Sequence, residues 1–447
     1  CLLRASGLDD EALKRPMIAI ANSWNEVVPG HKHLREVAES VKRGVLSAGG
    51  TPLEFNTIAI CDGIAMAHPG MRNPLPSREI IADSVEVEVE AHMFDALVCI
   101  ASCDKIVPGM LMAACRLDIP TVFVTGGSML PGWVRGRNLS FSDIYECVSS
   151  VKAGRMSEKE ILEFERSTCP GVGSCAGLYT ANTMQCLTEA LGLSLPYCGT
   201  APAVYSQKFA IAEESGRKIM ELLKRNITPR KVVTEKSLEN AIIIDMALGG
   251  STNTVLHLLA VAREGGVPLS LEKFDELSRR IPHLSNINPA GSYYLRDLHE
   301  AGGIPALMKE LSKYIHGDCL TVTGKTVSEN IKNAEVVRRD VIRPLRDPVH
   351  PEGGIAILKG TLAPNGAVVK QSAVDPHMMK FKGRAMVYNS EEEALDAILG
   401  GAVKSGHVVV IRYEGPKGGP GMREMLAATA AIKGLNLGKS VALITDG

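Results

Sequence analysis

Apolar runs and amphipathic segments alternate along the first 130 residues of the chain. The apolar runs are long enough for buried strands and are expected at residues 16–23, 53–60, 96–102 and 120–127. The segments between them carry helical periodicity and are expected to form helices at residues 31–50, 77–92 and 111–117. Ser77 is expected to cap the second of these helices. Strand and helix alternating at this spacing predict a parallel sheet flanked by helices, an α/β fold.

The pattern changes twice further along the chain. Residues 150–345 are expected to be mainly helical, and residues 176–193 and 242–262 show this best. A charged, proline-rich stretch follows at 338–354 and predicts a domain boundary. Short apolar runs then recur at residues 355–360, 367–374, 384–389, 407–413 and 441–445. We therefore expect an N-terminal α/β domain over 1–340 and a β-rich, barrel-like C-terminal domain over 341–447, truncated here.

Composition narrows the function classes. Lys and Arg number 49 against 50 Asp and Glu, so the charge offers no footprint for nucleic acid or an anionic membrane. No apolar run approaches the roughly 20 residues that cross a bilayer, and the first residues do not resemble a signal peptide. The eleven cysteines show no regular framework, which favours a reducing, cytoplasmic location. These features are typical of an enzyme acting on a small molecule.

Two cysteine-containing turns are candidates for chemistry. Cys103 directly follows an expected strand, beside a carboxylate and a lysine in A-S-C-D-K. Cys175 lies in C-P-G-V-G-S-C, a glycine-rich turn before an expected helix, whose N-terminus would favour the thiolate. Cys169 shares that turn, which is either a metal loop or a packed turn. Other cysteines lie inside apolar segments and are expected to be small buried side chains.

Carboxylates follow the same expected strands. Asp62 comes after the second strand and Asp104 after the third, while Glu414 and Glu424 flank a glycine-rich stretch. An aspartate at a strand end is more often a cap or turn residue. Two carboxylates in one crevice would nevertheless suit Mg²⁺. The glycine-rich stretch lacks the ending of a phosphate loop, and its glycines could instead let the backbone approach a small ligand.

Four histidines, His31, His33, His68 and His257, are possible acids, bases or ligands, although each is more often a satisfied structural residue. The residues alone thus indicate a metalloenzyme with one soft and one hard metal centre. A redox or iron-sensing protein is the alternative.

Several long motifs resemble those of the dihydroxy-acid dehydratase family, which includes phosphogluconate and sugar-acid dehydratases. They are N-S-W-N-E-V-V-P-G-H, C-D-G-I-A-M-A-H-P-G-M, L-P-S-R-E-I-I-A-D-S-V-E, S-C-D-K-I-V-P-G-M-L-M-A-A, G-S-C-A-G-L-Y-T-A-N-T-M and E-G-P-K-G-G-P-G-M-R-E-M-L. The resemblance runs from end to end of the chain. It implies an N-terminal α/β domain, a C-terminal barrel-like domain and a homodimer.

The resemblance also implies an iron–sulfur cluster, of two or four irons, and a Mg²⁺ ion. By position, Cys103 and Cys175 match cluster cysteines. The residues that match Mg²⁺ ligands are Asp62, Asp104, Glu424 and Lys105. The last of these matches a carbamylated lysine, because an unmodified ammonium has only donors and could not bind a cation.

The implied reaction removes water from a 2,3-dihydroxy carboxylic acid to give a 2-oxo acid, as in valine and isoleucine biosynthesis. Mg²⁺ would hold the carboxylate and 2-hydroxyl oxygens, and an iron of the cluster would bind the 3-hydroxyl. A sugar-acid or phosphogluconate dehydratase is the first alternative. A non-catalytic iron–sulfur sensor is a remote one, since it would not need the three Mg²⁺ carboxylates.

Two departures from the family pattern affect the expected site. Many two-iron members have Cys where this chain has Gly30. We expect Cys61, or else Cys169, to supply the third thiolate. The alternative is that Cys61 is only a packed neighbour of Asp62. The family also has a serine taken to be the general base just after T-D-G, where this chain stops at Gly447. The base is therefore expected beyond Gly447, and the 447-residue polypeptide alone is expected to be inactive.

Overall fold

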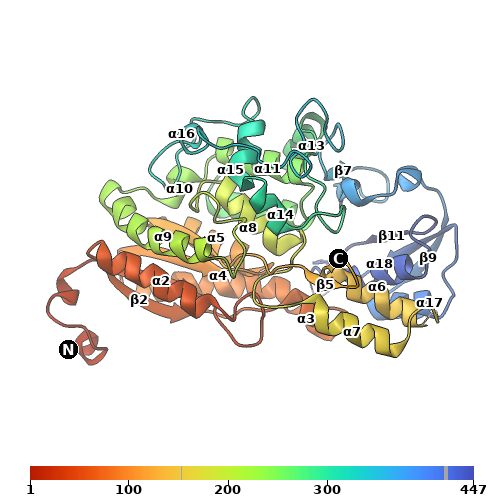
Figure 1. Ribbon diagram of the computed structural model, residues 1–447, viewed down its shortest axis with the longest axis horizontal. Coiled ribbons are helices and arrows are strands. Elements are labelled where there is room, and N and C mark those ends of the chain that lie inside the picture. The colour runs from red at the N-terminus through yellow and green to blue at the C-terminus, as the bar shows by residue number, and fades with distance from the viewer. Residues whose placement is uncertain (153, 417–420) are drawn as a thin grey trace. The chain divides into compact units, whose positions relative to one another are not determined.

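The computed structural model describes residues 1–152, 154–416 and 421–447, and forms two compact units (Figure 1). The first unit comprises Cys1–Ala59, Arg78–Met129 and Val172–Ser372. The second comprises Ile60–Ser77, Leu130–Gly171 and Ala373–Gly447. The units interleave segments from both halves of the chain, and the domain boundary expected at residue 340 stays a prediction.

A parallel four-stranded sheet organises the start of the first unit. Its order is β2–β1–β3–β4, formed by Thr51–Asn56, Met17–Asn22, Ala96–Ala101 and Thr121–Thr125. All three strand pairs are parallel, and Ile20 pairs with both Glu54 and Val98. Every residue of β3 and β4 is buried, as expected for central parallel strands covered on both faces. The α/β fold expected for the N-terminal region is confirmed.

Two local expectations were wrong. The strand expected at 53–60 ends at Asn56, so Cys61 lies several residues beyond it, where it precedes the short helix α3 (Asp62–Ala65). The helix expected from Ser77 begins earlier, because α4 spans Pro74–Ala91. Proline suits the first turn of a helix, where an N–H would lack a partner anyway. Ser77 therefore lies inside the helix, and its hydroxyl donates back to the Pro74 carbonyl at 2.6 Å.

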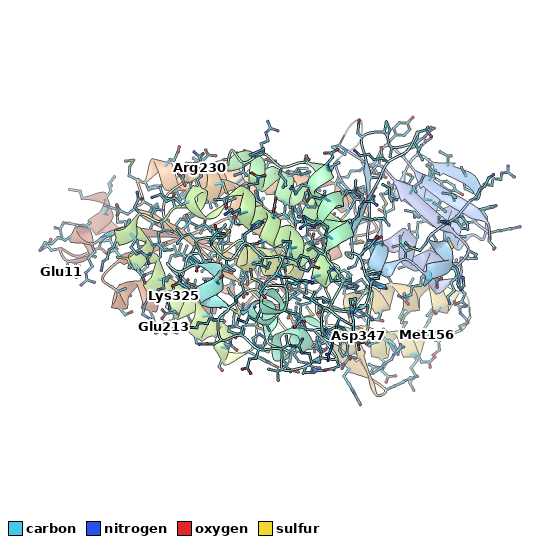
Figure 2. All side chains as sticks on the ribbon, turned by 90° about the horizontal axis from the view of Figure 1, so that it is seen from above. Glu11, Met156, Glu213, Arg230, Lys325 and Asp347 are labelled. Atoms are coloured by element: carbon cyan, nitrogen blue, oxygen red, sulfur yellow. The ribbon has the colours of Figure 1, made fainter. Side chains whose placement is uncertain are left out.

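Two long helices, α2 (Leu34–Ser47) and α9 (Ser206–Arg225), lie side by side against the sheet (Figure 1). Glycines allow their backbones to approach closely. A Cβ at Gly44 would lie 1.9 Å from the Glu213 carbonyl oxygen, and one at Gly216 would lie 2.1 Å from that of Val41. Glu213, labelled in Figure 2, also accepts hydrogen bonds from Arg43 and Arg217 through its carboxylate.

The rest of the first unit is mainly helical, as expected. Helix α5 (Ile106–Leu117) follows β3, and the later helices are α8 (Thr180–Ala190), α10 (Pro229–Val232), α11 (Glu235–Leu248), α12 (Asn253–Glu264), α13 (Leu271–Arg280), α14 (Leu295–Glu300), α15 (Gly303–Glu310) and α16 (Val327–Asn330). An antiparallel pair, β7 (Ala356–Leu358) and β8 (Ala367–Val369), lies near its end. Among the described residues, no helix has the length and apolar character needed to cross a membrane.

The second unit contains its own parallel sheet, of order β11–β10–β9. These strands are Ala442–Thr445, His407–Ile411 and Arg384–Tyr388. Helices α6 (Phe141–Lys152), α7 (Glu158–Thr168), α17 (Glu391–Leu399) and α18 (Leu426–Gly434) and the hairpin of β5 (Gly132–Val134) and β6 (Arg137–Leu139) complete it. The short C-terminal strands are confirmed, but barrel-like closure is not confirmed in the described residues. Helices alternate with parallel strands here, as they do in the first unit.

Candidate functional site

The turn that carries Cys103, Asp104 and Lys105 connects β3 to α5 in the first unit. All three side chains are buried, and Lys105 is fully so. The apolar strand and helix on either side bury the turn between them. Burying an ammonium is costly without compensating partners or neutralisation. The buried Lys105 side chain therefore needs either polar partners or neutralisation of its charge.

A buried histidine anchors the backbone of Cys103. The Cys103 N–H donates to His31 Nε2 at 3.1 Å, while His31 Nδ1 lies 2.8 Å from the Ser23 carbonyl. Because Nε2 accepts, Nδ1 must carry the proton, so the ring is neutral. Burial lowers the pKa of His31 to about 3, which agrees with that state. His31 thus positions the turn and does not supply a proton.

Gly30 marks the point where two thiol-bearing turns meet. A Cβ at Gly30 would lie 2.8 Å from Cys103 Sγ and 3.4 Å from the backbone nitrogen of Ser174. Ser174 immediately precedes Cys175, and the Gly173 N–H donates to the Pro29 carbonyl at 3.1 Å. The Cys103 thiol and the turn that carries Cys175 thus lie beside one glycine, and cysteine thiolates are suitable donors for soft metal ions. The residues present therefore fit an iron–sulfur group.

Cys175 and Cys169 belong to different compact units. Cys175 is half-buried in the first unit, in the turn before α8. Cys169 is exposed and belongs to the second unit, where it follows α7. Cys61 also belongs to the second unit, so the assignment of the third thiolate to Cys61, or else to Cys169, stays a prediction.

The second unit carries Cys61, Asp62 and Glu424. Cys61 is half-buried and directly precedes α3, and Asp62 is the buried first residue of that helix. A carboxylate oxygen of Asp62 lies within 4.8 Å of one of Glu424. Two oxygens bound to one Mg²⁺ are at most about 4.2 Å apart, so a small shift would allow both to bind one ion. Asp104, the other expected carboxylate ligand, belongs to the first unit.

A fully buried arginine beside Glu424 holds this part of the second unit. Arg423 donates to Glu414 at 3.0 Å and lies 2.9 Å from Glu391, and both carboxylates are also buried. It also donates to the partly buried Glu392 at 3.0 Å. Glu414, which flanks the glycine-rich stretch, is therefore engaged by Arg423 and by the Glu391 N–H at 2.9 Å. Residues 417–420 of that stretch lie outside the described part, so the expected backbone approach to a ligand stays a prediction.

The other three candidate histidines also have structural partners. His33 Nε2 lies 2.9 Å from the Gly126 carbonyl, and His68 Nδ1 accepts from the Gly70 N–H at 3.0 Å. Arg78 donates to His257 Nδ1 at 3.2 Å. Burial holds the pKa of His257 well below its usual value.

Sequence reasoning missed two sets of polar residues. Arg423 stands next to an expected ligand, but a single charged residue has no periodicity that would reveal its burial. Asn182 and Gln185 lie inside the buried helix α8 and contact the Cys175 turn. Two amides three residues apart in T-A-N-T-M-Q-C-L, shortly after the Cys175 turn, were the available signal.

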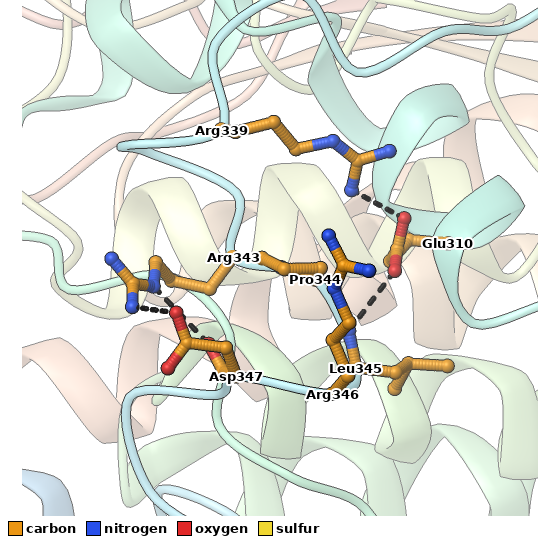
Figure 3. A pocket seen from close by; sticks show the side chains of 7 residues that line it. All are labelled: Glu310, Arg339, Arg343, Pro344, Leu345, Arg346 and Asp347. Carbon is orange, nitrogen blue, oxygen red and sulfur yellow. Dashed lines mark hydrogen bonds and ion pairs between the residues drawn. The ribbon is translucent and has the colours of Figure 1, made fainter.

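A surface pocket of about 590 Å³ contains none of the expected site residues (Figure 3). It is lined by Glu310, Arg339, Arg343, Pro344, Leu345, Arg346 and Asp347. Two of its arginines are already paired, since Arg339 binds Glu310 and Arg343 binds Asp347. Ion pairs at the surface contribute little to stability. The lining of this pocket gives no indication of a catalytic or metal site.

Comparisons with known proteins agree with this arrangement. The family model described as dihydroxy-acid/6-phosphogluconate dehydratase N-terminal matches residues 15–330, and its C-terminal counterpart matches residues 340–447. The chain is 58% identical to the dihydroxy-acid dehydratase of Caldanaerobacter subterraneus over the whole chain and 81% of the relative. The dihydroxy-acid dehydratases of Carboxydothermus hydrogenoformans and Pyrococcus furiosus are 59% and 58% identical over the same shares. The chain belongs to the dihydroxy-acid/6-phosphogluconate dehydratase family.

Proposed function

We propose that the chain is a hydro-lyase that converts 2,3-dihydroxy carboxylic acids to 2-oxo acids in branched-chain amino-acid synthesis. Its substrates are 2,3-dihydroxy-isovalerate and 2,3-dihydroxy-3-methylvalerate, the precursors on the way to valine and isoleucine. The observation that carries this is identity of 58–59%, over the whole chain, to enzymes named dihydroxy-acid dehydratase. Family membership implies that the activity depends on metal.

Two sets of residues are proposed to hold the metal groups. Cys103, Cys175 and, as third thiolate, Cys61 would bind an iron–sulfur cluster. The Mg²⁺ ligands would be Asp62, Asp104, Glu424 and carbamylated Lys105. The meeting of two thiol turns at Gly30 supports the first set. The proximity of the Asp62 and Glu424 carboxylates supports the second.

The burial of Lys105 supports its carbamylation. The side chain is fully buried in a turn next to Asp104. Carbamylation converts an ammonium, which has only donors, into an anionic group with oxygen acceptors. It would therefore remove a buried positive charge and supply a metal ligand at once. Mass spectrometry of the intact protein would detect the added CO₂.

The chain's own residues are proposed to hold and orient the reacting groups. When bound, the cluster and Mg²⁺ would supply Lewis acidity, at the 3-hydroxyl and at the carboxylate end of the substrate respectively. His31 keeps the Cys103 backbone in place through its neutral ring. Arg423 holds the segment that carries Glu424. Loss of the C2 proton and the 3-hydroxyl gives an enol, which tautomerises to the 2-oxo acid.

A sugar-acid or 6-phosphogluconate dehydratase is the second candidate, because the family model covers both activities. The full-length protein, reconstituted anaerobically with iron, sulfide and Mg²⁺, should be assayed on 2,3-dihydroxy-isovalerate, several aldonic acids and 6-phosphogluconate. We expect 2-oxo acid to form fastest from dihydroxy-isovalerate. Faster turnover of an aldonic acid or of 6-phosphogluconate would replace the proposed function with the second candidate.

Several finer expectations stay predictions. They are the nuclearity of the cluster, the third thiolate, a homodimeric assembly, a cytoplasmic location and a barrel-like C-terminal domain. Iron and sulfide analysis, with sedimentation of the reconstituted protein, would test the cluster and the assembly. Cys61→Ser should lower the cluster content, and unchanged content would exclude Cys61 as a ligand.

A further inference from the structure

A network of buried amide and hydroxyl groups lies behind the turn that carries Cys175. Its side chains are Ser174, Asn182 and Gln185, all in the first unit and each no more than 2% exposed. The Ser174 hydroxyl donates to Asn182 Oδ1 at 2.7 Å. Gln185 Nε2 donates to the Ser174 hydroxyl oxygen at 2.9 Å, and Gln185 Oε1 accepts from the Gly127 N–H at 2.8 Å. Burying three polar side chains is tolerated only because they satisfy one another and the backbone.

The Asn182 amide nitrogen is directed at the cysteine turn itself. It donates to the carbonyls of Cys175 and Gly177, the second at 2.7 Å. The carbonyl between them, that of Ala176, accepts from the Leu295 N–H at 3.0 Å. Three successive carbonyls of the turn are therefore held by fixed donors.

Holding the carbonyls also fixes the direction of the N–H groups. In a planar trans peptide the C=O and N–H point in opposite directions. The N–H groups of Ala176, Gly177 and Leu178 must therefore point away from the donors that hold the carbonyls. The Leu178 N–H agrees with this, since it donates to the Asn288 carbonyl at 2.7 Å.

We propose that Asn182, supported by Ser174 and Gln185, is a positioning residue that fixes the direction of the Ala176 N–H through the Cys175 carbonyl and so keeps this N–H available to the sulfur of Cys175. N–H groups that donate to a cluster sulfur are among the features that set the reduction potential of an iron–sulfur group. Partners of this kind also govern how tightly a ligand holds its metal. The inference rests on the proposed assignment of Cys175 as a cluster ligand.

The test removes the amide donor of Asn182 and keeps the size and shape of the side chain. Asn182→Asp retains an oxygen that can accept from Ser174 but removes the donor to the Cys175 and Gly177 carbonyls. Asn240→Asp is a matched control, because Asn240 is also fully buried in the first unit. It accepts from the His316 N–H at 2.8 Å and donates to the His316 carbonyl at 3.0 Å, in a segment without candidate cysteines.

Full-length wild-type protein and both variants should be reconstituted anaerobically. The measurements are iron and sulfide per chain, the reduction potential, the rate of iron loss to a chelator, and the melting temperature of the cluster-free protein. We expect both variants to melt at lower temperature. Only Asn182→Asp should lose iron faster, by about tenfold as for other lost partners of metal ligands, and show a lower reduction potential.

Ser174→Ala keeps the test decisive if Asn182→Asp fails to fold. It removes the hydroxyl that orients Asn182 and should shift both cluster measurements in the same direction, by a smaller amount. If Asn182→Asp has the iron-loss rate and reduction potential of wild type, the inference is wrong and the proposed cofactor stands. If only Ser174→Ala folds, wild-type values in that variant lead to the same conclusion. Wild-type protein that takes up no cluster would overturn the proposed cofactor, and the inference with it.

Discussion

Gly30 occupies a position where any side chain would meet the Cys103 thiol. Its backbone does not require glycine, because no positive φ is recorded there. The requirement is one of space, since a Cβ would lie 2.8 Å from Cys103 Sγ. Single residues at this site are thus constrained by neighbours distant in sequence and not by local conformation.

Gly30→Ala should impair cluster uptake while leaving most of the fold intact. The added methyl group would lie 2.8 Å from the Cys103 thiol and 3.3 Å from the Ser102 hydroxyl, so the thiol must shift, and overpacking of this kind costs about 1–3 kcal/mol. Iron and sulfide per chain after anaerobic reconstitution provide the measurement. Gly360→Ala is the control, because its Cβ would meet nothing within 4 Å. Equal cluster content in the two variants would contradict the expected collision.

A second residue-scale prediction concerns acid stability. Burial, and then the neighbouring His350, lowers the pKa of His283 to about 4. The two rings stack with centroids 5.1 Å apart, and their Nδ1 atoms lie 2.8 Å apart. In the unfolded chain the pKa returns to about 6.5, so protonation favours unfolding. The stabilisation is present above pH 6.5 and is lost as the pH falls toward 4.

The free energy of unfolding should therefore fall by as much as about 1.4 kcal/mol per pH unit from this group, between pH 6.5 and 4. Urea denaturation at several pH values measures the slope. His283→Asn should flatten it. The exposed His92, replaced in the same way, serves as control. A slope unchanged by His283→Asn would assign the acid sensitivity to other groups.

At the scale of elements, Arg423 connects the ends of three pieces of secondary structure. It precedes α18, Glu391 begins α17, and Glu414 follows β10. A buried charge with buried partners cannot be removed alone without leaving the others uncompensated. The same interactions hold the backbone next to Glu424, so stability and the proposed metal binding are expected to be linked at this position.

Arg423→Gln should destabilise the protein by about 3–5 kcal/mol, because it leaves buried carboxylates without their cation. It should also weaken Mn²⁺ binding measured by electron paramagnetic resonance. Arg116→Gln is the matched control: Arg116 pairs with Glu79, Asp83, Glu86 and Glu264, but its side chain is 19% exposed. We expect that control to cost about 1 kcal/mol or less per pair, with unchanged Mn²⁺ affinity. Equal Mn²⁺ affinity in the two variants would argue against a link between Arg423 and the metal.

For the whole molecule, family membership predicts dependence on a divalent cation. Removal of divalent ions from the reconstituted enzyme with a chelator that spares the cluster should abolish dehydration, and Mg²⁺ should restore it. Iron and sulfide content, followed in the same samples, separates loss of Mg²⁺ from loss of the cluster. Full activity without any divalent cation would remove the role proposed for Asp62 and Glu424.

The types of secondary structure, and a candidate site, were predictable from the sequence. Apolar runs in alternation with amphipathic segments were enough to predict a parallel α/β sheet, because buried parallel strands and their covering helices have distinct periodicities. The turn after β3, with Cys103, Asp104 and Lys105, was recognisable because reactive side chains follow a buried strand. Exact element ends were less well predicted, since Asn56 ends a strand expected to reach residue 60.

Contacts between residues far apart in the sequence became known from the folded chain. Gly30 lies beside Cys103, Asn182 holds the carbonyl of Cys175, and Arg423 binds Glu391. Periodicity describes which face of an element is buried, but it does not say which polar group on another element will satisfy a buried donor or charge. That choice follows from packing and from the cost of leaving such groups unsatisfied, and it emerges only when the chain is folded.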